Sequence, residues 1–292
     1  MSHTFQSEVG RIKSILIKPV QNAFQDTEQI QEEWQHLNYK GVPQHDLAIR
    51  QYEEFESHIR ATGAEVHHLP SSEGLTMDSI YCRDAAIASD HGMIICNMGK
   101  DARKQEPEAI KKALMDHGFK ILGQVDGEGT IEGGDVAWVD PHTLAVGKSY
   151  RTNPEGVRQL KALLEPNGVT VLDFDLPHWR GVNDIFHLMS IFSPIDHKKA
   201  LIYPELLPIG LYKLLKEKGF QMIELAEDEY DNQGCNVLAL APSRCLMVEG
   251  SDQTKAHLIE AGCEVIEFPG TEIAIKGEGG PTCLTRPLER YI

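Results

Sequence analysis

The sequence predicts an α/β protein, a five-bladed αβ propeller built from pseudo-fivefold ββαβ modules. Four segments, starting at Asp84, Asp135, His187 and Asn236, repeat one order of two β-rich runs, an amphipathic helix and a third strand. The starts lie 51, 52 and 49 residues apart, and a further step of 47 reaches Cys283. A fixed period of this size indicates a repeat architecture. A fifth module shared between the two chain ends would close the ring.

The module that starts at Asp135 shows the pattern most clearly. Its expected strands cover 135–140, 144–149 and 169–176, and its helix covers 156–168. Apolar residues recur at helical spacing along the helix, which ends at a glycine suited to a C-cap. In three other modules the two strands, the helix and the third strand are expected, in this order, at 85–89, 93–98, 107–118 and 119–125; at 187–193, 200–204, 210–219 and 220–225; and at 236–242, 243–250, 253–262 and 263–270. In the shared module a strand, a helix and a strand are expected at 11–19, 52–63 and 64–70, and the C-terminal segment 282–288 completes it.

Composition restricts the classes of function. With 28 basic and 44 acidic residues the net charge is −16, which argues against nucleic-acid or anionic-membrane partners because these need clustered Lys and Arg. No linker-like stretch divides the chain, so we expect one domain over 1–292. The sequence shows no signal peptide and no membrane span, which favours a cytoplasmic protein. Six cysteines without zinc-type spacing are expected to be reduced.

A glycine-rich segment, IKGEGGPTCLTRPL, leads to Cys283. Glycines permit close backbone approach and unusual dihedrals, so this loop can present a thiol to a cleft. A buried structural cysteine is the alternative. A phosphate-binding loop is poorly supported, since no Gly-Lys-Ser/Thr and no helix follow.

Several acidic residues and a histidine stand at module starts, together with Cys283. His187 is expected to begin a strand and can act as an acid or a base near neutral pH. Glu132, Asp78 and Asp84 precede strands as well; a turn or a solvated loop is their alternative, as a structural histidine is for His187. Because a closed ring gathers equivalent positions, we expect a thiol, an imidazole and carboxylates in one pocket.

That combination favours covalent catalysis on a cationic planar group. A thiol with a histidine suggests a nucleophile and its acid-base partner. Carboxylates around them suit a guanidinium, which pairs with them in bidentate fashion. A metal site at His67 and His68 is not expected, because adjacent residues on a strand point to opposite faces. No metal or organic cofactor is needed for this chemistry.

The sequence resembles the guanidine-modifying superfamily of arginine deiminases, amidinotransferases and dimethylarginine dimethylaminohydrolases. The resemblance runs from about Arg11 to Leu288, and its motifs are, in order, YCRDAAI, IEGGDV, GKSYRTN, FHLMS and GGPTCLT. The ordered set is far more specific than any single motif. The resemblance implies the five-module propeller fold called pentein, which agrees with the period found above.

The resemblance also implies residue roles. Cys283 would be the nucleophile, His187 the general acid and base, and Glu132 the carboxylate that orients both the guanidinium and His187. The remaining implied contacts are to the substrate: Asp84 to the guanidinium nitrogens, Asp78 to the α-ammonium, and Arg103 and Arg151 to the α-carboxylate. For Arg103 an alternative has equal weight, namely that it is an exposed residue near the start of a helix.

Two features favour the dimethylaminohydrolase branch and one opposes it. The chain lacks the additional helical domain of arginine deiminases, and Met189 follows His187 where deiminases and amidinotransferases usually carry Asp. Arg83, however, stands where dimethylaminohydrolases usually have a second acid. The resulting Arg-Asp pair is typical of deiminases and amidinotransferases, so the preference for methylated arginine stays open.

The expected function is a Cys-dependent amidine hydrolase of the EC 3.5.3 class, similar to dimethylargininase. It would cleave arginine or N-methylated arginine to citrulline and an amine through a Cys-bound intermediate. An arginine deiminase, an amidinotransferase with an amine acceptor and a non-catalytic binding module are the alternatives. The expected partner is a small guanidino amino acid, and a homodimer is compatible with the sequence. Residues 21–41 are read either as a lid or as a surface helix with its connection.

Overall fold

The computed structural model describes residues 2–181 and 186–292. Within them, five three-stranded sheets share one topology, in which an antiparallel pair of strands is followed by a helix and a parallel third strand. The sheet that joins the chain ends contains β3 (Ser14–Ile17), β4 (Glu65–His68) and β17 (Thr285–Pro287), with α3 (His45–Arg60) before β4. The expected completion of this unit by the C-terminal segment is confirmed, because β17 pairs with β3.

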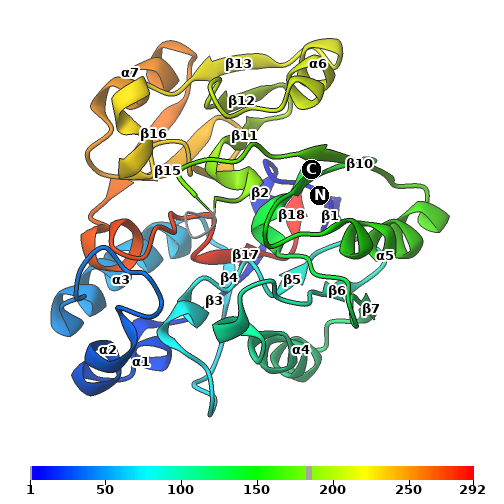
Figure 1. Cartoon of the computed structure of the whole chain (residues 1–292). Coiled ribbons are helices and arrows are strands. Elements are labelled where there is room, and N and C mark those ends of the chain that lie inside the picture. The colour runs from blue at the N-terminus through cyan, green and yellow to red at the C-terminus, as the bar shows by residue number, and fades with distance from the viewer. Residues whose placement is uncertain (1, 182–185) are drawn as a thin grey trace.

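The other four units follow in chain order. Their elements are β5 (Ala86–Ile87), β6 (Met93–Ile95), α4 (Glu106–Asp116) and β7 (Ile121–Gln124); β8 (Val136–Asp140), β9 (Thr143–Lys148), α5 (Pro154–Leu164) and β10 (Thr170–Asp175); β11 (Phe192–Asp196), β12 (Lys199–Ile202), α6 (Ile209–Glu217) and β13 (Gln221–Glu224); and β14 (Leu238–Ala241), β15 (Arg244–Val248), α7 (Asp252–Glu260) and β16 (Glu264–Phe268). In Figure 1 the helices α3 to α7 lie at the periphery and the short strands lie toward the middle.

Short elements connect these units. A small sixth sheet joins the chain ends and contains β1 (His3–Thr4), β2 (Arg11–Ile12) and β18 (Arg290–Tyr291). Between β3 and α3 lie α1 (Val20–Ala23) and α2 (Thr27–Glu33). The single-turn helices are η1 (Met77–Ile80), η2 (Asp101–Arg103), η3 (Gly133–Asp135), η4 (Glu165–Asn167), η5 (Leu188–Ser190), η6 (Glu227–Asn232) and η7 (Thr271–Ile275).

Helix α5 shows how local sequence sets an element. The side chain of Asn153 accepts a hydrogen bond of 2.8 Å from the backbone of Gly156, and Pro154 occupies the first helical position. Val157, Leu160 and Leu164 lie on one face and are buried. This amphipathic helix therefore packs on its own sheet, as its sequence predicts.

The strand expected to begin at His187 is wrong. His187 instead caps η5, because its backbone N–H donates to the Ser190 hydroxyl at 3.2 Å and its carbonyl accepts from the Ser190 N–H at 2.9 Å. Local side-chain bonds of this kind compete with strand pairing. The strand β11 starts at Phe192 and ends at Asp196, beyond the expected strand end at 193.

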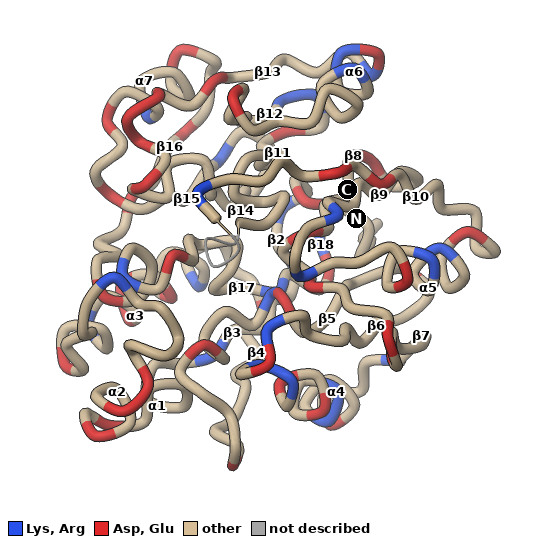
Figure 2. The backbone as a smooth tube through the Cα atoms, viewed as in Figure 1, with Lys and Arg blue, Asp and Glu red and all other residues tan. Residues whose placement is uncertain are grey.

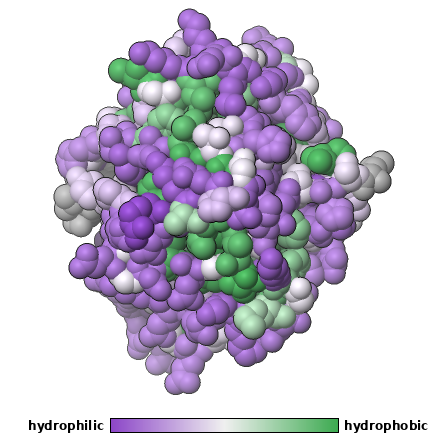
Figure 3. Space-filling model, turned by 90° about the vertical axis from the view of Figure 1, so that its right-hand side faces the viewer, coloured by the Kyte–Doolittle hydropathy of each residue, from purple (hydrophilic) through white to green (hydrophobic). Residues whose placement is uncertain are grey.

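Buried apolar side chains form three clusters, each shared between neighbouring units. The face in Figure 3 is mostly hydrophilic, with hydrophobic side chains gathered near its middle. In the described part of the chain no helix combines the length and the hydropathy that a bilayer span requires.

Candidate active site

One cavity collects most of the predicted site residues. Its lining includes Asp78, Asp84, Arg103, Arg151, His187 and Cys283. These come from η1, from the segments before β5 and α4, from the β9–α5 connection, from the cap of η5 and from the loop before β17. The repeat thus brings together positions that are about two hundred residues apart in the chain. Glu132 is fully buried and reaches this cavity through its contact with His187.

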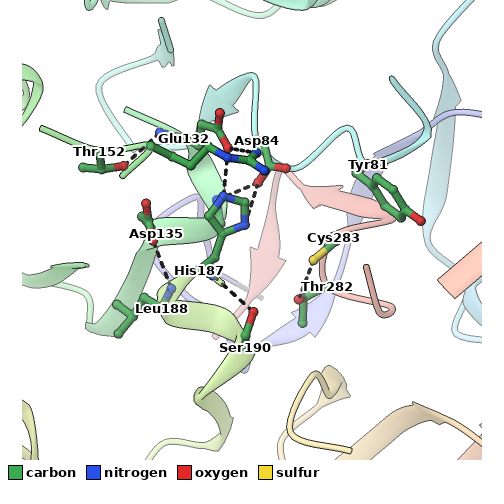
Figure 4. A network of polar contacts seen from close by, with 12 residues as sticks. Tyr81, Asp84, Glu132, Asp135, Thr152, His187, Leu188, Ser190, Thr282 and Cys283 are labelled. Atoms are coloured by element: carbon green, nitrogen blue, oxygen red, sulfur yellow. Dashed lines mark hydrogen bonds and ion pairs between the residues drawn. The ribbon is translucent and has the colours of Figure 1, made fainter. Parts of the chain in front are cut away.

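His187 lies between two carboxylates (Figure 4). Its Nε2 is 2.8 Å from Oε2 of Glu132, and its Nδ1 is 3.8 Å from Oδ1 of Asp84. Burial alone would lower the pKa of His187. The negative charges of Asp84 and Asp135, with side-chain hydrogen bonds to Cys283 and Glu132, outweigh burial and raise this pKa well above its ordinary value. The imidazole is therefore protonated at neutral pH and able to deliver a proton.

Glu132 is the best-connected acid of the site. Its Oε1 accepts backbone N–H bonds from Gly99 at 3.0 Å and Lys100 at 3.2 Å, while Oε2 lies 2.9 Å from Nη1 of Arg151. Burial raises the pKa of Glu132, but the charge of Arg151 and the hydrogen bond to His187 outweigh it, and the pKa falls below its ordinary value. Glu132 therefore stays ionised and holds the imidazole in a fixed orientation.

Both carboxylate oxygens of Asp84 accept hydrogen bonds. Oδ2 accepts a bond of 2.6 Å from Nη1 of Arg103, and Oδ1 accepts a bond of 2.9 Å from the backbone N–H of Gly134. Arg103 further donates to both oxygens of Glu106, at 2.8 Å and 2.7 Å, and to the Tyr81 carbonyl at 2.8 Å. The alternative of an exposed Arg103 is wrong, since only 3% of this residue is exposed.

Lys100 is a cavity residue that sequence reasoning missed. Its Nζ lies 2.6 Å from Oδ2 of Asp78 and 3.0 Å from the carbonyl oxygen of Leu37. Leu37 and Asn38 line the cavity and belong to the segment 21–41, so that segment contributes to the cavity wall. Nothing in the sequence around Asp78 points to Lys100, because the pair joins side chains of separate segments.

Asp135 is a second missed residue. Its Oδ2 accepts from the Ser149 hydroxyl at 2.6 Å and its Oδ1 from the backbone N–H of Leu188 at 3.0 Å. The latter bond fixes the turn that follows His187 (Figure 4). Burial raises the pKa of Asp135. The available signal was its place in IEGGDV, where two glycines separate it from Glu132.

Cys283 lies at the cavity wall and is 5% exposed. The side-chain amide of Asn236, also missed as a site residue, donates to its sulfur at 3.2 Å, and the Thr282 hydroxyl lies 3.9 Å from it. The preceding glycines allow the loop backbone to pack closely against neighbouring side chains. A Cβ on Gly277, for example, would stand 1.9 Å from the Tyr81 hydroxyl. These glycines are not needed for unusual backbone dihedrals, because the residue with positive φ in this loop is Glu278, at 59°.

The Arg83 side chain is directed away from the cavity. It is fully buried, and its Nη2 donates to Oε1 of Glu8 at 2.9 Å. Arg83 is not part of the cavity lining, whereas its neighbour Asp84 is. Arg83 and Asp84 therefore cannot both contact one substrate in this cavity. The presence of this pair does not distinguish deiminases and amidinotransferases from dimethylaminohydrolases.

The carboxylates of the site are paired with internal cations: Asp78 with Lys100, Asp84 with Arg103, and Glu132 with Arg151. Asp84, Glu132 and His187 also present oxygen and nitrogen atoms within 4.8 Å of one another, a grouping that could hold a metal ion. A divalent cation would compete with two guanidinium groups and a protonated imidazole there. The arrangement better suits a flat organic cation that shares the carboxylates with these side chains.

Gly134 leaves the space in which His187 and Asp84 meet. A Cβ at this position would stand 2.4 Å from Nδ1 of His187 and 2.7 Å from Oδ1 of Asp84. Gly134→Ala should therefore displace one of the two groups and lower kcat/KM by about a hundredfold, because a shift of roughly 1 Å in an active-site group has an effect of that order. Steady-state kinetics check this, with Gly210→Ala as the control, since its Cβ would meet the Phe174 ring at 3.1 Å, away from the cavity lining. Equal activity of the two variants would contradict the assigned packing.

A buried cysteine, a protonated histidine and paired carboxylates around one cavity, on repeated ββαβ units, place the chain in the guanidine-modifying superfamily. Residues 18–290 match the family model described as N,N dimethylarginine dimethylhydrolase, eukaryotic, and the chain belongs to this family.

Individual relatives agree with this assignment. The N(G),N(G)-dimethylarginine dimethylaminohydrolase of Pseudomonas aeruginosa is 25% identical over 248 residues, which cover 85% of this chain and 91% of that protein. Arginine deiminase of Latilactobacillus sakei is 26% identical over 254 residues, covering 72% of this chain and 61% of the deiminase. A solved structure of a mutant of the Pseudomonas aeruginosa enzyme with citrulline shares the fold, with a TM-score of 0.77 at 23% identity over 96% of this chain and 100% of that one.

Proposed function

We propose that the protein hydrolyses the guanidinium carbon-nitrogen bond of arginine or an N-methylated arginine, giving citrulline and an amine through an intermediate on Cys283. The observation that carries the proposal is that Cys283, His187 and Asp84 line one cavity, with Glu132 hydrogen bonded to His187 behind it. The family match and the named activities of the relatives support a hydrolase acting on guanidino groups.

In the first half of the proposed reaction, the Cys283 thiolate adds to the central guanidinium carbon. His187, protonated because of its surrounding acids, gives its proton to the departing amine, and the carbon-nitrogen bond breaks. The product of this half is a thiouronium on Cys283 that retains the amino acid chain of the substrate. Guanidinium resonance makes the carbon a poor electrophile, so Asp84 has to hold the plane while sulfur approaches its face.

In the second half, His187 is neutral and acts as a base. It takes one proton from water as the oxygen attacks the thiouronium carbon. The second proton of that water passes to solvent as the urea carbonyl forms, the carbon-sulfur bond breaks, and citrulline and the Cys283 thiolate are released. Glu132 would hold His187 through both halves by the contact of 2.8 Å between its Oε2 and Nε2 of His187. Each proton that leaves His187 with the amine is thus replaced by one from water.

The amino acid end of the substrate would bind between Asp78, Arg151 and Lys100, which all line the cavity. Asp78 would accept the α-ammonium in competition with Lys100. Arg151 would donate to the α-carboxylate; its Nε is buried and has no hydrogen-bond partner among the described residues. A buried donor without a partner is costly, so a ligand oxygen at this position would be stabilising.

Arg151→Ala should change the preference between arginine and agmatine, which lacks the carboxylate. We expect kcat/KM for arginine to fall about tenfold to a hundredfold more than kcat/KM for agmatine, the usual range for a hydrogen bond to a charged group. Any loss common to both substrates reports the separate contact of Arg151 with Glu132. Steady-state kinetics on the two substrates measure the ratio, and an unchanged ratio would refute the carboxylate contact.

Competing activities give different products from the same assay. Purified protein is incubated separately with arginine, monomethylarginine and asymmetric dimethylarginine, and citrulline, ornithine, ammonia and methylamines are measured. Citrulline with methylamines supports a dimethylaminohydrolase, and citrulline with ammonia from arginine alone supports a deiminase. Ornithine that appears only with an acceptor amine indicates an amidinotransferase, and binding without any product would leave a non-catalytic module.

Two structural inferences accompany this function. We infer that the five units close into a ring, the αβ propeller, because strands of neighbouring units contact one another, as β11 does with β8 and with β14. We also propose that residues 21–41 restrict access to the cavity, since Leu37 and Asn38 line it. A single domain over 1–292 and a homodimer stay predictions.

A further inference from the structure

A cluster of buried charges lies on the other side of the Arg83–Asp84 segment, away from the cavity. Its members are Glu8, Arg83, Arg286 and Arg290, with 8%, 0%, 4% and 1% of their surface exposed. Arg286 lies in β17 and Arg290 in β18, and Figure 2 shows basic residues on and beside these strands in the middle of the molecule. The cluster thus holds three positive charges against one negative charge.

The contacts among these residues leave many donors unused. Arg83 donates to Glu8 at 2.9 Å, and Nη1 of Arg290 donates to the carbonyl oxygens of Gly10 at 2.6 Å and Ala239 at 2.8 Å. Six buried guanidinium nitrogens have no partner among the described residues: Nε and Nη1 of Arg83, Nε and Nη2 of Arg286, and Nε and Nη2 of Arg290. A buried donor that stays unpaired destabilises the fold, and a charged one does so more strongly.

Within 2–181 and 186–292, no other nearby group supplies the missing negative charge. Cys82 and Cys96 lie close enough to interact with Arg286, but burial raises the pKa of Cys82 to about 12 and raises that of Cys96 further, so both thiols are neutral. Asp84 is engaged by Arg103. Burial lowers the pKa of Arg286 to about 10 and that of Arg290 to about 9, so both still carry a charge at neutral pH.

We propose that Arg83, Arg286 and Arg290 form a buried binding site for a small monovalent anion of the halide class. Three guanidinium groups supply the donors and the charge, and the near-complete burial of their side chains favours a small ion over a larger one. Glu8 links the cluster to the surface, because it also lines a second cavity together with Val9, Trp138 and Ile292. The site is distinct from the candidate active site, although the Arg83 backbone N–H donates to the Cys283 carbonyl at 3.2 Å.

The first test is thermal unfolding of the whole protein in sodium gluconate buffer, with gluconate replaced stepwise by chloride or bromide at constant ionic strength. An anion that binds only the folded state stabilises it by mass action. Tm should therefore rise by several degrees and level off as the site fills. A Tm that stays flat, or that rises without saturation, would overturn the proposal.

Two further measurements locate the effect. Arg286→Met should remove the halide-dependent rise in Tm, whereas Arg158→Met, at an arginine whose side chain is 67% exposed, should retain it. If Arg286→Met does not fold, the wild-type protein decides: crystals grown in sodium bromide should give an anomalous peak between the three guanidinium groups. Bromide peaks found only elsewhere would refute the site. Neither readout depends on turnover, so the result is independent of the proposed hydrolase activity.

Discussion

Cys283→Ser is expected to lower turnover of every guanidino substrate by at least about a thousandfold, the scale on which removal of a catalytic nucleophile acts. A hydroxyl is a far weaker nucleophile than a thiolate toward a resonance-stabilised carbon. Its replacement of the sulfur would leave Asn236 and Thr282 with a polar partner, so the fold should persist. Citrulline formation and circular dichroism measure the two effects separately.

A matched control isolates the role of this one thiol. Cys263 is also buried, but it lies immediately before β16 and is not part of the cavity lining. Cys263→Ser should keep activity close to that of the unmodified protein. Substantial citrulline formation by a folded Cys283→Ser protein would argue against covalent catalysis, as would equal losses in the two variants.

Glu132→Gln is expected to lower kcat by about a hundredfold and to change the pH profile. The substitution removes the negative charge that Oε2 places 2.8 Å from Nε2 of His187. The raised pKa of His187 depends in part on this hydrogen bond, so the pKa should fall in the variant. Because the proposed first half needs protonated His187, activity is lost as pH rises through that pKa. The alkaline limb of kcat/KM should therefore move to lower pH.

The same substitution has a defined effect on stability. The folded-state pKa of Glu132 is lowered from 4.5, so its stabilisation is present above the unfolded pKa and is lost as pH falls through the folded value. Glu132→Gln should thus reduce Tm at neutral pH and reduce it less in acid. Glu108→Gln, at an acid whose side chain is 84% exposed, is the control. An alkaline limb that stays in place would show that Glu132 does not set the protonation of His187.

The repeat and its helix ends were predictable because they depend on local sequence. Each of the five peripheral helices is followed by a glycine in the left-handed region, where residues without Cβ are favoured, with φ between 75° and 83°. These are Gly63, Gly118, Gly168, Gly219 and Gly262. Apolar spacing then sets the face of each helix that is buried. Strand starts were less accurate, since the turn after His187 is fixed by Ser190 and by Asp135 of the preceding unit.

The candidate site likewise has a part that the sequence predicts and a part that it does not. Motif positions place Cys283, His187 and the acids at equivalent points of the repeat, and the structure brings them to one cavity. Which cation faces which carboxylate could not be predicted, because Lys100 meets Asp78 only through the packing of separate loops. The same holds for Asn236, whose amide reaches Cys283 from another unit. Charge pairs between units depend on the assembled fold, and the repeat in the sequence does not indicate them.

The most direct test of the central claim is rapid acid quenching of the reaction, followed by mass spectrometry of the peptide that contains Cys283. The account predicts an adduct on Cys283 with the mass of arginine less ammonia. Asymmetric dimethylarginine should give the same adduct, because dimethylamine leaves before the quench. An unmodified Cys283 at every quench time during turnover, or an adduct on another residue, would contradict the account.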